Sequence, residues 1–511
     1  MSDFYPYSNG EFITTGVRHE VFNPYDQTLV AATLLVSADD LDKAIVSAHH
    51  SKRALASLST WERADILRFI AQELRSQKED FAILITLESG KPLTSSRTEV
   101  ERAIETFLIA SEETKRIPNE YFSIDWTPAG SGKEGLVKHF PCGIVAGIAP
   151  FNFPLNLAVH KIAPAIAAGC PIILKPASST PLSVLKLAQI IHTSNLPKGA
   201  FSALPMDRKT GNLLVSDERV SMVSFTGSAV VGWGLKQQSG KKKVVLELGG
   251  NAGVILTPTS NLNMAITKCI KGGFSYSGQV CIHTQRIIVH QSIYQQFVSD
   301  FVNGVKALKA GNPLNPETEM SVLIDEENAL RIESWVQEAL DAGATLLCGG
   351  THKGNFFEPT VLTGTTPTLK VCNEEIFGPV VTVESYDRFT EAVDMINQGP
   401  YGLQAGVFTD SILEMNEAFN LLEVGGVIIN DVPTFRADHM PYGGVKNSGF
   451  GREGVKYAIQ HMMEPRVLVK KSSIRRCYLL TGPFGHPQSG SMPNNKPNEY
   501  ISLYFKQLIH Y

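Results

Sequence analysis

The chain has 511 residues, which is too long for a single hydrophobic core, so two or three domains are expected. Its composition, 43% hydrophobic and 19% charged, is that of an ordinary soluble globular protein. The formal net charge of -4 disfavours a partner such as nucleic acid or a membrane surface, and the one basic cluster, Lys241–Lys243, is short enough to be a solvated loop.

The ends and the cysteines favour a cytoplasmic protein. The start, MSDFYPYSNGEF, lacks the apolar stretch of a secretory signal, and no run of about 18 apolar residues predicts a transmembrane helix. The cysteines, seven in number and without paired spacing, suit a reducing compartment rather than a disulfide framework. No CxxC or HExxH motif occurs, so no zinc site is expected.

The first quarter of the chain is expected to be mostly helical. Ser37 is in the position of an N-cap before a segment whose apolar residues recur at helical spacing. Ser59 and Glu62 have the spacing of a capping box ahead of a second amphipathic helix. Two more helices are expected around residues 79–90 and 99–116.

After Lys138 short apolar runs alternate with helical segments, which is typical of a parallel sheet with helical crossovers. The expected strands are residues 143–149, 171–175, 201–205, 222–227 and 244–250, with helices at 156–169 and 181–194. Ligands bind at the carboxyl ends of such strands. Lys175, Gly227, Ser228 and Glu247 lie at those ends.

A second alternating block, from about Gly250 to Gly449, predicts a second α/β domain with strands at residues 286–290, 344–350, 380–386, 405–409 and 425–430. The apolar run RVLVK (466–470) is expected to be an edge strand that pairs with another chain. The segment after Ser472 is rich in Pro, Asn, Ser and Gly and is expected to be a flexible tail.

Three residues are candidates for chemistry, and each has a simpler interpretation. Asn152, between aromatics and prolines, could donate to an oxyanion or bond its own backbone in a turn. Glu247, in an apolar strand before two glycines, could be a base or half of an ion pair. Cys281 could be a nucleophile toward a carbonyl carbon or a small buried hydrophobe.

Taken together, the motifs around these residues resemble those of the NAD(P)-dependent aldehyde dehydrogenases. The matching stretches occur in family order over roughly residues 5 to 470: PFNFP (150–154), ILKPASSTP (173–181), SFTGS (224–228), LELGGN (246–251), GQVC (278–281), EEIFGPV (374–380) and MPYGGVKNSGFGREG (440–454). Several motifs in order are far more specific than any one of them alone, and they favour the nucleophile interpretation of Cys281.

The resemblance implies a fold and a domain plan. The fold is α/β, with a Rossmann-like cofactor domain, an α/β catalytic domain and a β oligomerisation arm. Residues 1–122 and 142–249 would bind the dinucleotide, residues 250–448 would form the catalytic domain, and residues 123–141 and 455–471 would form the arm. Residues 472–511 fall outside the resemblance. Family members are homodimers or homotetramers, so a homo-oligomer is expected.

The resemblance also implies a mechanism. Cys281 would attack an aldehyde to give a thiohemiacetal, whose oxyanion Asn152 and the Cys281 backbone N–H would hold. Hydride transfer to the nicotinamide would leave a thioester, and Glu247 would activate the water that releases a carboxylic acid. Two alternatives stay open: a member that transfers the acyl group to coenzyme A, and a catalytically silent relative.

Cofactor residues follow from the same resemblance. The segment from Gly227 to Gly232 takes the place of a G-x-G-x-x-G loop, with Ser228 near the pyrophosphate. Lys175 and Glu375 would hold the two riboses, and Phe377 would pack near the nicotinamide. Many NAD-linked relatives have glutamate at position 178. Ser178 removes that charge, so the choice between NAD and NADP stays open, unless Ser178 merely caps a helix.

Several basic residues at channel positions favour a small polar or anionic aldehyde. Arg102, His160, Arg436 and His439 could form a cationic mouth, as in members that act on lactaldehyde, succinate semialdehyde or phosphonoacetaldehyde. Val280 stands where members that bind a phosphate have arginine, which disfavours a phosphorylated substrate. The alternative is that these residues form surface ion pairs.

Overall fold

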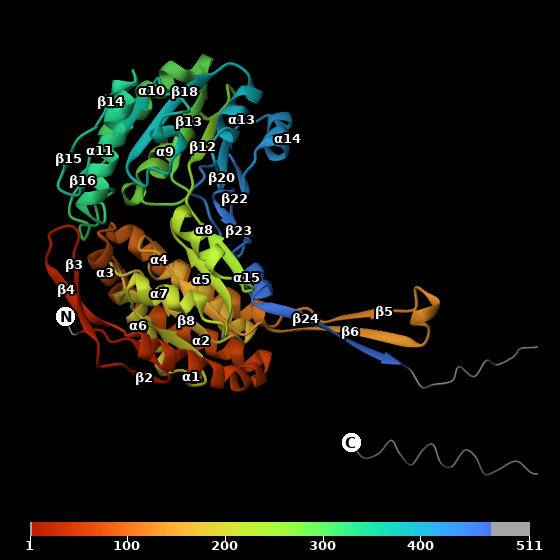
Figure 1. Ribbon diagram of the computed structural model, residues 1–511. Helices are drawn as coiled ribbons and strands as arrows, with labels where there is room; N and C mark the ends of the chain where they lie inside the picture. The colour runs from red at the N-terminus through yellow and green to blue at the C-terminus, as the bar shows by residue number, and fades with distance from the viewer. Residues whose placement is uncertain (1–2, 472–511) are drawn as a thin grey trace, which may run out of the picture. The chain divides into compact units, whose positions relative to one another are not determined.

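The computed structural model describes residues 3–471, and the tail predicted after Ser472 lies outside this range. The described residues divide into a larger unit, residues 3–120 with Leu136–Val467, and a smaller one, Tyr121–Gly135 with residues 468–471. The larger unit has two lobes, each built on its own sheet (Figure 1). The α/β class predicted from the sequence is therefore confirmed.

The first sheet has the strand order β2-β1-β9-β8-β7-β10-β11-β23. Its central strands, from β9 to β11, are parallel, whereas β1, β2 and β23 pair antiparallel at the two edges. The bounds are β1 (Tyr7–Ser8), β2 (Glu11–Phe12), β7 (Ile144–Ile148), β8 (Ile172–Lys175), β9 (Phe201–Ala203), β10 (Val220–Thr226), β11 (Lys243–Glu247) and β23 (Gly449–Phe450). The five strands predicted between residues 143 and 250 are all present.

Helices cover this sheet, and the first two begin as the sequence predicts. The Ser37 and Ser59 side chains accept hydrogen bonds from the backbone N–H groups of Asp40 and Glu62. The carboxylates of Asp40 and Glu62 in turn accept from the backbone N–H groups of Ser37 and Ser59. The bounds are α1 (Ala38–Ser57), α2 (Thr60–Ser76), α3 (Lys78–Ser89), α4 (Leu93–Thr114), α5 (Asn156–Ala168), α6 (Leu182–His192), α7 (Arg208–Ser216) and α8 (Ala229–Gln238).

Two local differences from the sequence prediction have a simple cause. The helix expected from residue 99 begins at Leu93, directly after Pro92, a residue that is common at helix starts. The polar residues that follow Leu93 lack the apolar spacing by which a helix is recognised in a sequence. Before α1 the chain forms β1, β2 and a hairpin of β3 (Val17–Phe22) and β4 (Leu29–Leu35). Strand β3 is exposed at most of its positions, so its apolar pattern is weak.

The second sheet has the order β14-β17-β18-β13-β12-β20-β21, parallel except for β14. Its strands are β12 (Ala252–Leu256), β13 (Thr284–His290), β14 (Thr345–Cys348), β17 (Thr360–Thr363), β18 (Val380–Tyr386), β20 (Gln404–Phe408) and β21 (Gly426–Ile429). The accompanying helices are α9 (Leu262–Phe274), α10 (Gln291–Lys306), α11 (Glu326–Asp341), α12 (Lys370–Asn373), α13 (Phe389–Asn397) and α14 (Ile412–Leu421). The last helix, α15 (Val455–His461), packs instead on α5 and α4 of the first lobe. Small two-stranded sheets join β15 (His352–Lys353) to β16 (Phe356–Phe357) and β19 (Tyr401–Gly402) to β22 (Val445–Lys446).

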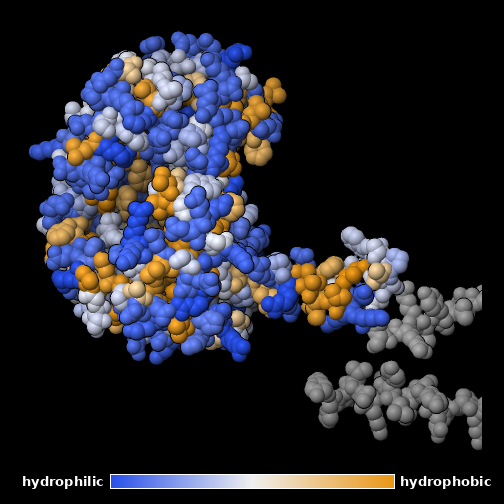
Figure 2. Space-filling model, viewed as in Figure 1, coloured by the Kyte–Doolittle hydropathy of each residue, from blue (hydrophilic) through white to orange (hydrophobic). Residues whose placement is uncertain are grey.

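The predicted strand RVLVK lies within β24 (Met463–Lys471), which joins β6 (Lys133–Pro141) and β5 (Glu120–Ser123) in the order β24-β6-β5. Every residue of β24 after Met463 is exposed. Hydrophobic side chains are also exposed on α14, among them Ile412, Leu413 and Phe419. Figure 2 shows hydrophobic residues at the surface over this helix. None of the described helices combines the length and the apolar character needed to cross a membrane.

Candidate active site

A cavity of about 640 Å³ opens at the carboxyl ends of the parallel strands of the first sheet. It brings together residues that lie far apart in the sequence. Its lining includes the predicted Asn152, Gly227, Ser228, Glu247, Cys281, Glu375 and Phe377. Arg331, Trp335 and Tyr401, which the sequence did not single out, line it as well. Within residues 3–471 no group of three or more His, Cys, Asp or Glu side chains could hold a metal ion.

Cys281 follows a short and tightly constrained turn. Tyr276 and Ser277 in that turn have φ angles of 49° and 53°. A Cβ on Gly278 would lie 2.1 Å from the Gly378 carbonyl oxygen, so only glycine fits there. Burial raises the pKa of the Cys281 thiol to about 11, although a hydrogen bond with Tyr442 acts to lower it. The Cys281 Sγ lies 3.1 Å from the Tyr442 Oη.

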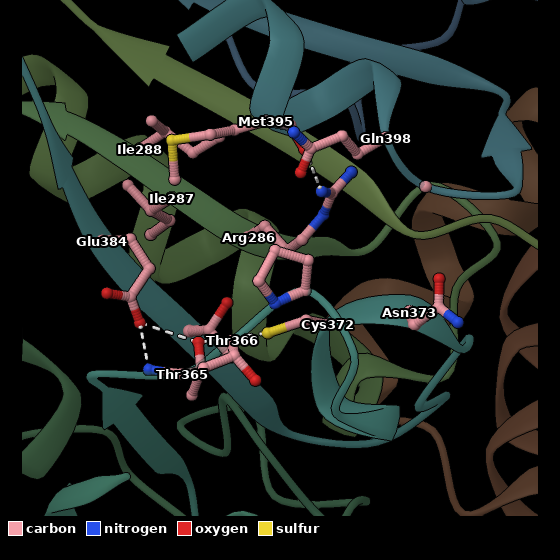
Figure 3. Close-up of a pocket in the computed structure, with 13 residues that line it drawn as sticks. Arg286, Ile287, Ile288, Thr365, Thr366, Cys372, Asn373, Glu384, Met395 and Gln398 are labelled. Atoms are coloured by element: carbon pink, nitrogen blue, oxygen red, sulfur yellow. Dashed lines mark hydrogen bonds between the residues drawn. The ribbon is translucent and has the colours of Figure 1, made fainter. Parts of the chain in front are cut away.

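Neither of the basic residues next to Cys281 in the sequence acts on its sulfur. The His283 Nε2 bonds the Gly273 carbonyl at 2.8 Å, and burial lowers the pKa of this ring to about 4. Arg286 points into a separate cavity of about 60 Å³ in the second lobe (Figure 3). Its guanidinium donates there to the carbonyls of Met395, Ile396 and Asn251. Both residues are therefore structural.

Asn152 lies on the loop after β7 and is 3% exposed. Its Oδ1 accepts from the Phe153 N–H at 3.1 Å, and its Nδ2 donates to the Gln279 carbonyl at 2.9 Å. These bonds tie the Asn152 loop to the turn that carries Cys281. The second N–H of the side-chain amide has no hydrogen-bond partner among the described residues, and Asn152 lines the cavity.

Glu247 ends β11 and is 3% exposed, yet neither of its carboxylate oxygens has a hydrogen-bond partner among the described residues. Burial, and then the nearby carboxylate of Glu453, raise the pKa of Glu247 well above its usual value. A Cβ on Gly443 would lie 2.9 Å from its Oε1. A carboxyl group without partners, held in a cavity shared with Cys281, is free to bind a water molecule.

Glu375 is held by the two glycines that follow Glu247. The Gly250 N–H donates to its Oε1 at 3.0 Å, and a Cβ on Gly249 would lie 2.2 Å from its Oε2. Burial raises the pKa of Glu375 to about 7, while the Gly250 bond and Arg331 oppose the rise. Phe377 stands edge-on to Phe151 with ring centres 5.8 Å apart.

The beginning of α8 also faces the cavity. Ser228 is the N-cap of this helix, but its side chain makes no capping hydrogen bond, and Ser228 to Val231 all line the cavity. Free N–H groups at a helix N-terminus favour a phosphate. A Cβ on Gly227 would lie 2.6 Å from the Phe225 ring.

The two remaining cofactor candidates lie at the edge of this arrangement. Ala177 and Ser179 line the cavity, whereas Lys175 and Ser178 are not among its lining residues. Burial lowers the pKa of Lys175, and the negative charge of Asp207 partly opposes this change. Ser178 is exposed, and its carbonyl oxygen lies 2.8 Å from the His19 Nε2.

Three of the four predicted substrate residues meet at a carboxylate that the sequence did not single out, Asp438. The Arg102 guanidinium bonds both Asp438 oxygens, at 3.1 and 2.6 Å. The His160 Nε2 lies 2.8 Å from Asp438 Oδ1, and the Arg436 Nη2 lies 3.5 Å from the other ring nitrogen of His160. His439, the fourth, is exposed and makes none of these bonds.

The same group extends to a buried ion pair. Lys161 Nζ lies 2.9 Å from Glu453 Oε1, and Arg436 Nη2 lies 3.2 Å from Glu453 Oε2. Burial would raise the pKa of Glu453, but Lys161 and Arg436 outweigh it and bring the value to about 2. We call Arg102, His160, Lys161, Arg436, Asp438 and Glu453 the charged cluster.

The charged cluster carries a positive excess. Burial and Arg436 lower the pKa of His160, so this ring is neutral. The His160 and Arg102 contacts hold the pKa of Asp438 well below its usual range in spite of burial. Three cations therefore face two carboxylates. Arg102 is the most open of them, with 26% of its side chain exposed.

Comparison with known proteins gives one consistent result. A model of the Aldehyde dehydrogenase family matches residues 13–468. The chain is 42% identical to a 3-sulfolactaldehyde dehydrogenase of Priestia aryabhattai over 465 residues, which are 91% of this chain and 97% of that protein.

Solved structures agree. The crystal structure of aldehyde dehydrogenase 21 from Physcomitrella patens, in complex with the reaction product succinate, superposes with a TM-score of 0.91 at 44% identity and covers 92% of this chain and 98% of that one. Glyceraldehyde-3-phosphate dehydrogenase GapN from Methanocaldococcus jannaschii, complexed with NADP, has a TM-score of 0.86 at 38% identity, over 90% of this chain and 100% of that one.

Proposed function

This chain belongs to the aldehyde dehydrogenase family, and we propose that it oxidises a small anionic aldehyde to the carboxylic acid with NAD or NADP. The observation that supports this most strongly is that Cys281, Glu247 and Asn152, from three separate parts of the sequence, line one cavity. They are a nucleophile, a base and an oxyanion donor, which are the groups that oxidation through a thioester requires.

In the proposed reaction, the Cys281 sulfur attacks the aldehyde carbon and forms a thiohemiacetal. The free N–H of Asn152 donates to the resulting oxyanion, and its bond to the Gln279 carbonyl keeps this donor close to the Cys281 turn. Once the carbon has been oxidised, Cys281 holds the acyl group as a thioester.

Glu247 then removes a proton from a water molecule, which attacks the thioester and releases the acid. Its lack of hydrogen-bond partners supports this role, because a carboxylate engaged in an ion pair would be a weak base. The same observation disfavours transfer of the acyl group to coenzyme A, because that reaction needs no base to activate water.

The residues at the cavity fit a dinucleotide. The uncapped N-terminus of α8 suits a pyrophosphate, and Glu375, with the space that Gly249 leaves beside it, suits a ribose hydroxyl. Phe377 and Phe151 offer an apolar surface to a nicotinamide ring. When bound, NAD or NADP supplies the acceptor for hydride.

Two observations support an anionic substrate. The charged cluster has more cations than carboxylates, and Arg102 is partly exposed. The names of the relatives point the same way, since sulfolactaldehyde carries a sulfonate, glyceraldehyde 3-phosphate a phosphate and succinate two carboxylates. We propose that Arg102 binds the anionic end of the aldehyde, with Arg436 and His160 holding Asp438 behind it.

We further propose that the protein is a cytoplasmic homodimer or homotetramer. The exposed edge of β24 supports this, because unpaired strand edges pair readily with a second chain. Sedimentation of the purified protein measures the assembly directly, and a monomer at micromolar concentration would contradict it.

The test is a panel of short aldehydes of equal length that end in methyl, hydroxyl, carboxylate or sulfonate, each with NAD and with NADP. We expect kcat/KM for the anionic members to exceed that for the methyl member by about tenfold or more, as one desolvated ion pair allows. Activity should require no coenzyme A and should be lost after thiol alkylation. No turnover of any aldehyde, or a strict need for coenzyme A, would refute the proposal.

A further inference from the structure

Tyr442 lies against the proposed nucleophile, although no sequence motif assigned it a role. It is 3% exposed, and its Oη lies 3.1 Å from the Cys281 Sγ. Its backbone is fixed by paired bonds with Glu453, at 3.0 Å and 2.6 Å. Within residues 3–471, this is the one side-chain hydrogen bond of the Cys281 sulfur.

A buried cation is stacked on the Tyr442 ring. The Arg436 guanidinium carbon lies 3.8 Å from the ring centre, and Arg436 is anchored by Glu453. A cation over an aromatic face attracts the π electrons and makes the hydroxyl proton more positive. Arg436 therefore makes Tyr442 a stronger hydrogen-bond donor.

The groups that face Cys281 come from three parts of the chain. The carboxylates of Glu247, at the end of β11, and Glu375, on the turn after α12, raise the pKa of the thiol, as burial does. Arg436 and Tyr442, from the loop before β22, lower it. Burial, with Cys281 and Glu247 nearby, raises the pKa of Tyr442, so its hydroxyl keeps its proton.

We propose that Tyr442 is a further catalytic residue: its hydroxyl donates a hydrogen bond to the Cys281 sulfur and stabilises the thiolate that attacks the aldehyde. The thiol loses its proton to solvent in the cavity, the sulfur then has lone pairs only, and the neutral hydroxyl is the donor in contact with it. This inference rests on the proposed function, since it assigns a role at the same nucleophile.

The test is the rate of alkylation of Cys281 by iodoacetamide as a function of pH, in protein without cofactor or aldehyde. Mass spectrometry of the peptide that contains Cys281 separates it from the other cysteines. We expect Tyr442→Phe to raise the midpoint of the pH profile by about one unit, because a hydrogen bond to an ionised group is lost. Phenylalanine keeps the ring, and with it the contact with Arg436.

Tyr401→Phe is the matched control. It removes a hydroxyl from the same cavity, but one that bonds Glu374 Oε2 at 3.2 Å and not the sulfur. Its alkylation midpoint should equal that of the unmodified protein. A change in the shape of the turn would instead alter the rate by the same factor at every pH and leave the midpoint where it is.

An unchanged or lowered midpoint in Tyr442→Phe would overturn the inference, as would an equal shift in Tyr401→Phe. Because alkylation needs no turnover, its outcome is independent of the aldehyde panel. A raised midpoint in a protein that oxidises no aldehyde would refute the proposed function alone. Normal aldehyde oxidation with an unshifted midpoint would refute the role of Tyr442 alone.

Discussion

At the scale of single residues, the sequence identified the three side chains with a clear chemical role and missed those whose role depends on contacts made in the folded chain. Cys281, Glu247 and Asn152 each follow a recognisable stretch, and all three line the cavity. Asp438 lies just before the last motif and Tyr442 lies within it, but the sequence does not show what either side chain contacts. Only the fold brings Asp438 to Arg102 and His160, more than two hundred positions earlier in the chain.

Ser178 gives a prediction about cofactor choice. Its side chain is exposed and uncharged, so nothing at this position repels a 2′-phosphate. We expect Ser178→Glu to lower kcat/KM with NADP by about tenfold or more, through charge repulsion, and to leave kcat/KM with NAD nearly unchanged. Steady-state kinetics with both cofactors measures this. Ser178→Gln, similar in size but neutral, is the control, and an equal loss with both cofactors in Ser178→Glu would contradict the prediction.

Gly249 gives a prediction about the position of Glu375. A Cβ at this residue would lie 2.2 Å from the Glu375 Oε2, so Gly249→Ala must displace that carboxylate. We expect KM for the cofactor to rise roughly tenfold to 100-fold, since a displacement of about 1 Å at a binding group has effects of that size. Initial rates at varied cofactor concentration test it.

Gly234→Ala is the control for this substitution. Gly234 lies in α8, and a Cβ there would meet nothing within 4 Å. This variant should keep the KM for the cofactor and gain about 0.5–1 kcal/mol of stability from helix propensity. A normal KM in Gly249→Ala would show that Glu375 does not need this space.

At the scale of elements, local chemistry explains what the sequence could predict. The capping boxes at Ser37 and Ser59 are formed by residues three positions apart, so both helix starts were correctly predicted. The N-termini of α5 and α6 lack such residues. They are capped instead by Glu99 and Glu88, which come from α4 and α3 and which no local pattern could identify.

Glu88 predicts a dependence of stability on pH. Its Oε2 accepts from the Leu182 N–H at 2.7 Å and its Oε1 from the Ser183 N–H at 3.1 Å, yet burial raises its pKa to about 7. The unfolded value is about 4.3. Between these two values the native state holds a proton that the unfolded state has lost. The contribution of Glu88 to the free energy of unfolding is therefore greatest below about pH 4.3 and falls as the pH rises toward 7.

We expect this decrease to be on the order of 3 kcal/mol for Glu88, and Glu375, also with a pKa of about 7, adds a decrease of the same sign. Glu88→Gln, which cannot ionise, should remove the part of the slope due to Glu88 and leave the parts due to Glu375 and Glu247. Urea unfolding at a series of pH values between 5 and 8 measures it, and an unchanged slope in Glu88→Gln would refute the assignment.

At the scale of the whole molecule, the alternation of strands and helices predicted a parallel sheet followed by a second α/β block, and the structure has two sheets whose central strands are parallel. Strands β1 to β4 were not predicted, because β1 and β2 have two residues each and β3 is mostly exposed. How the two lobes enclose one cavity could not be derived from periodicity. The order of the motifs indicated that their residues share one site, and the structure shows that residues from these motifs line the same cavity.

The most direct test of the central claim is a single-turnover experiment on Glu247→Gln, with a good aldehyde substrate from the panel and saturating cofactor. Glutamine fills the same space but cannot take a proton from water, so oxidation should proceed once and hydrolysis should stall. We expect a burst of reduced cofactor of about one equivalent per active site, followed by turnover at least 100-fold slower than in the unmodified protein. Intact-protein mass spectrometry should then find the acyl group on Cys281. Steady turnover near the unmodified rate, or a stalled protein without an acyl group on Cys281, would contradict the account.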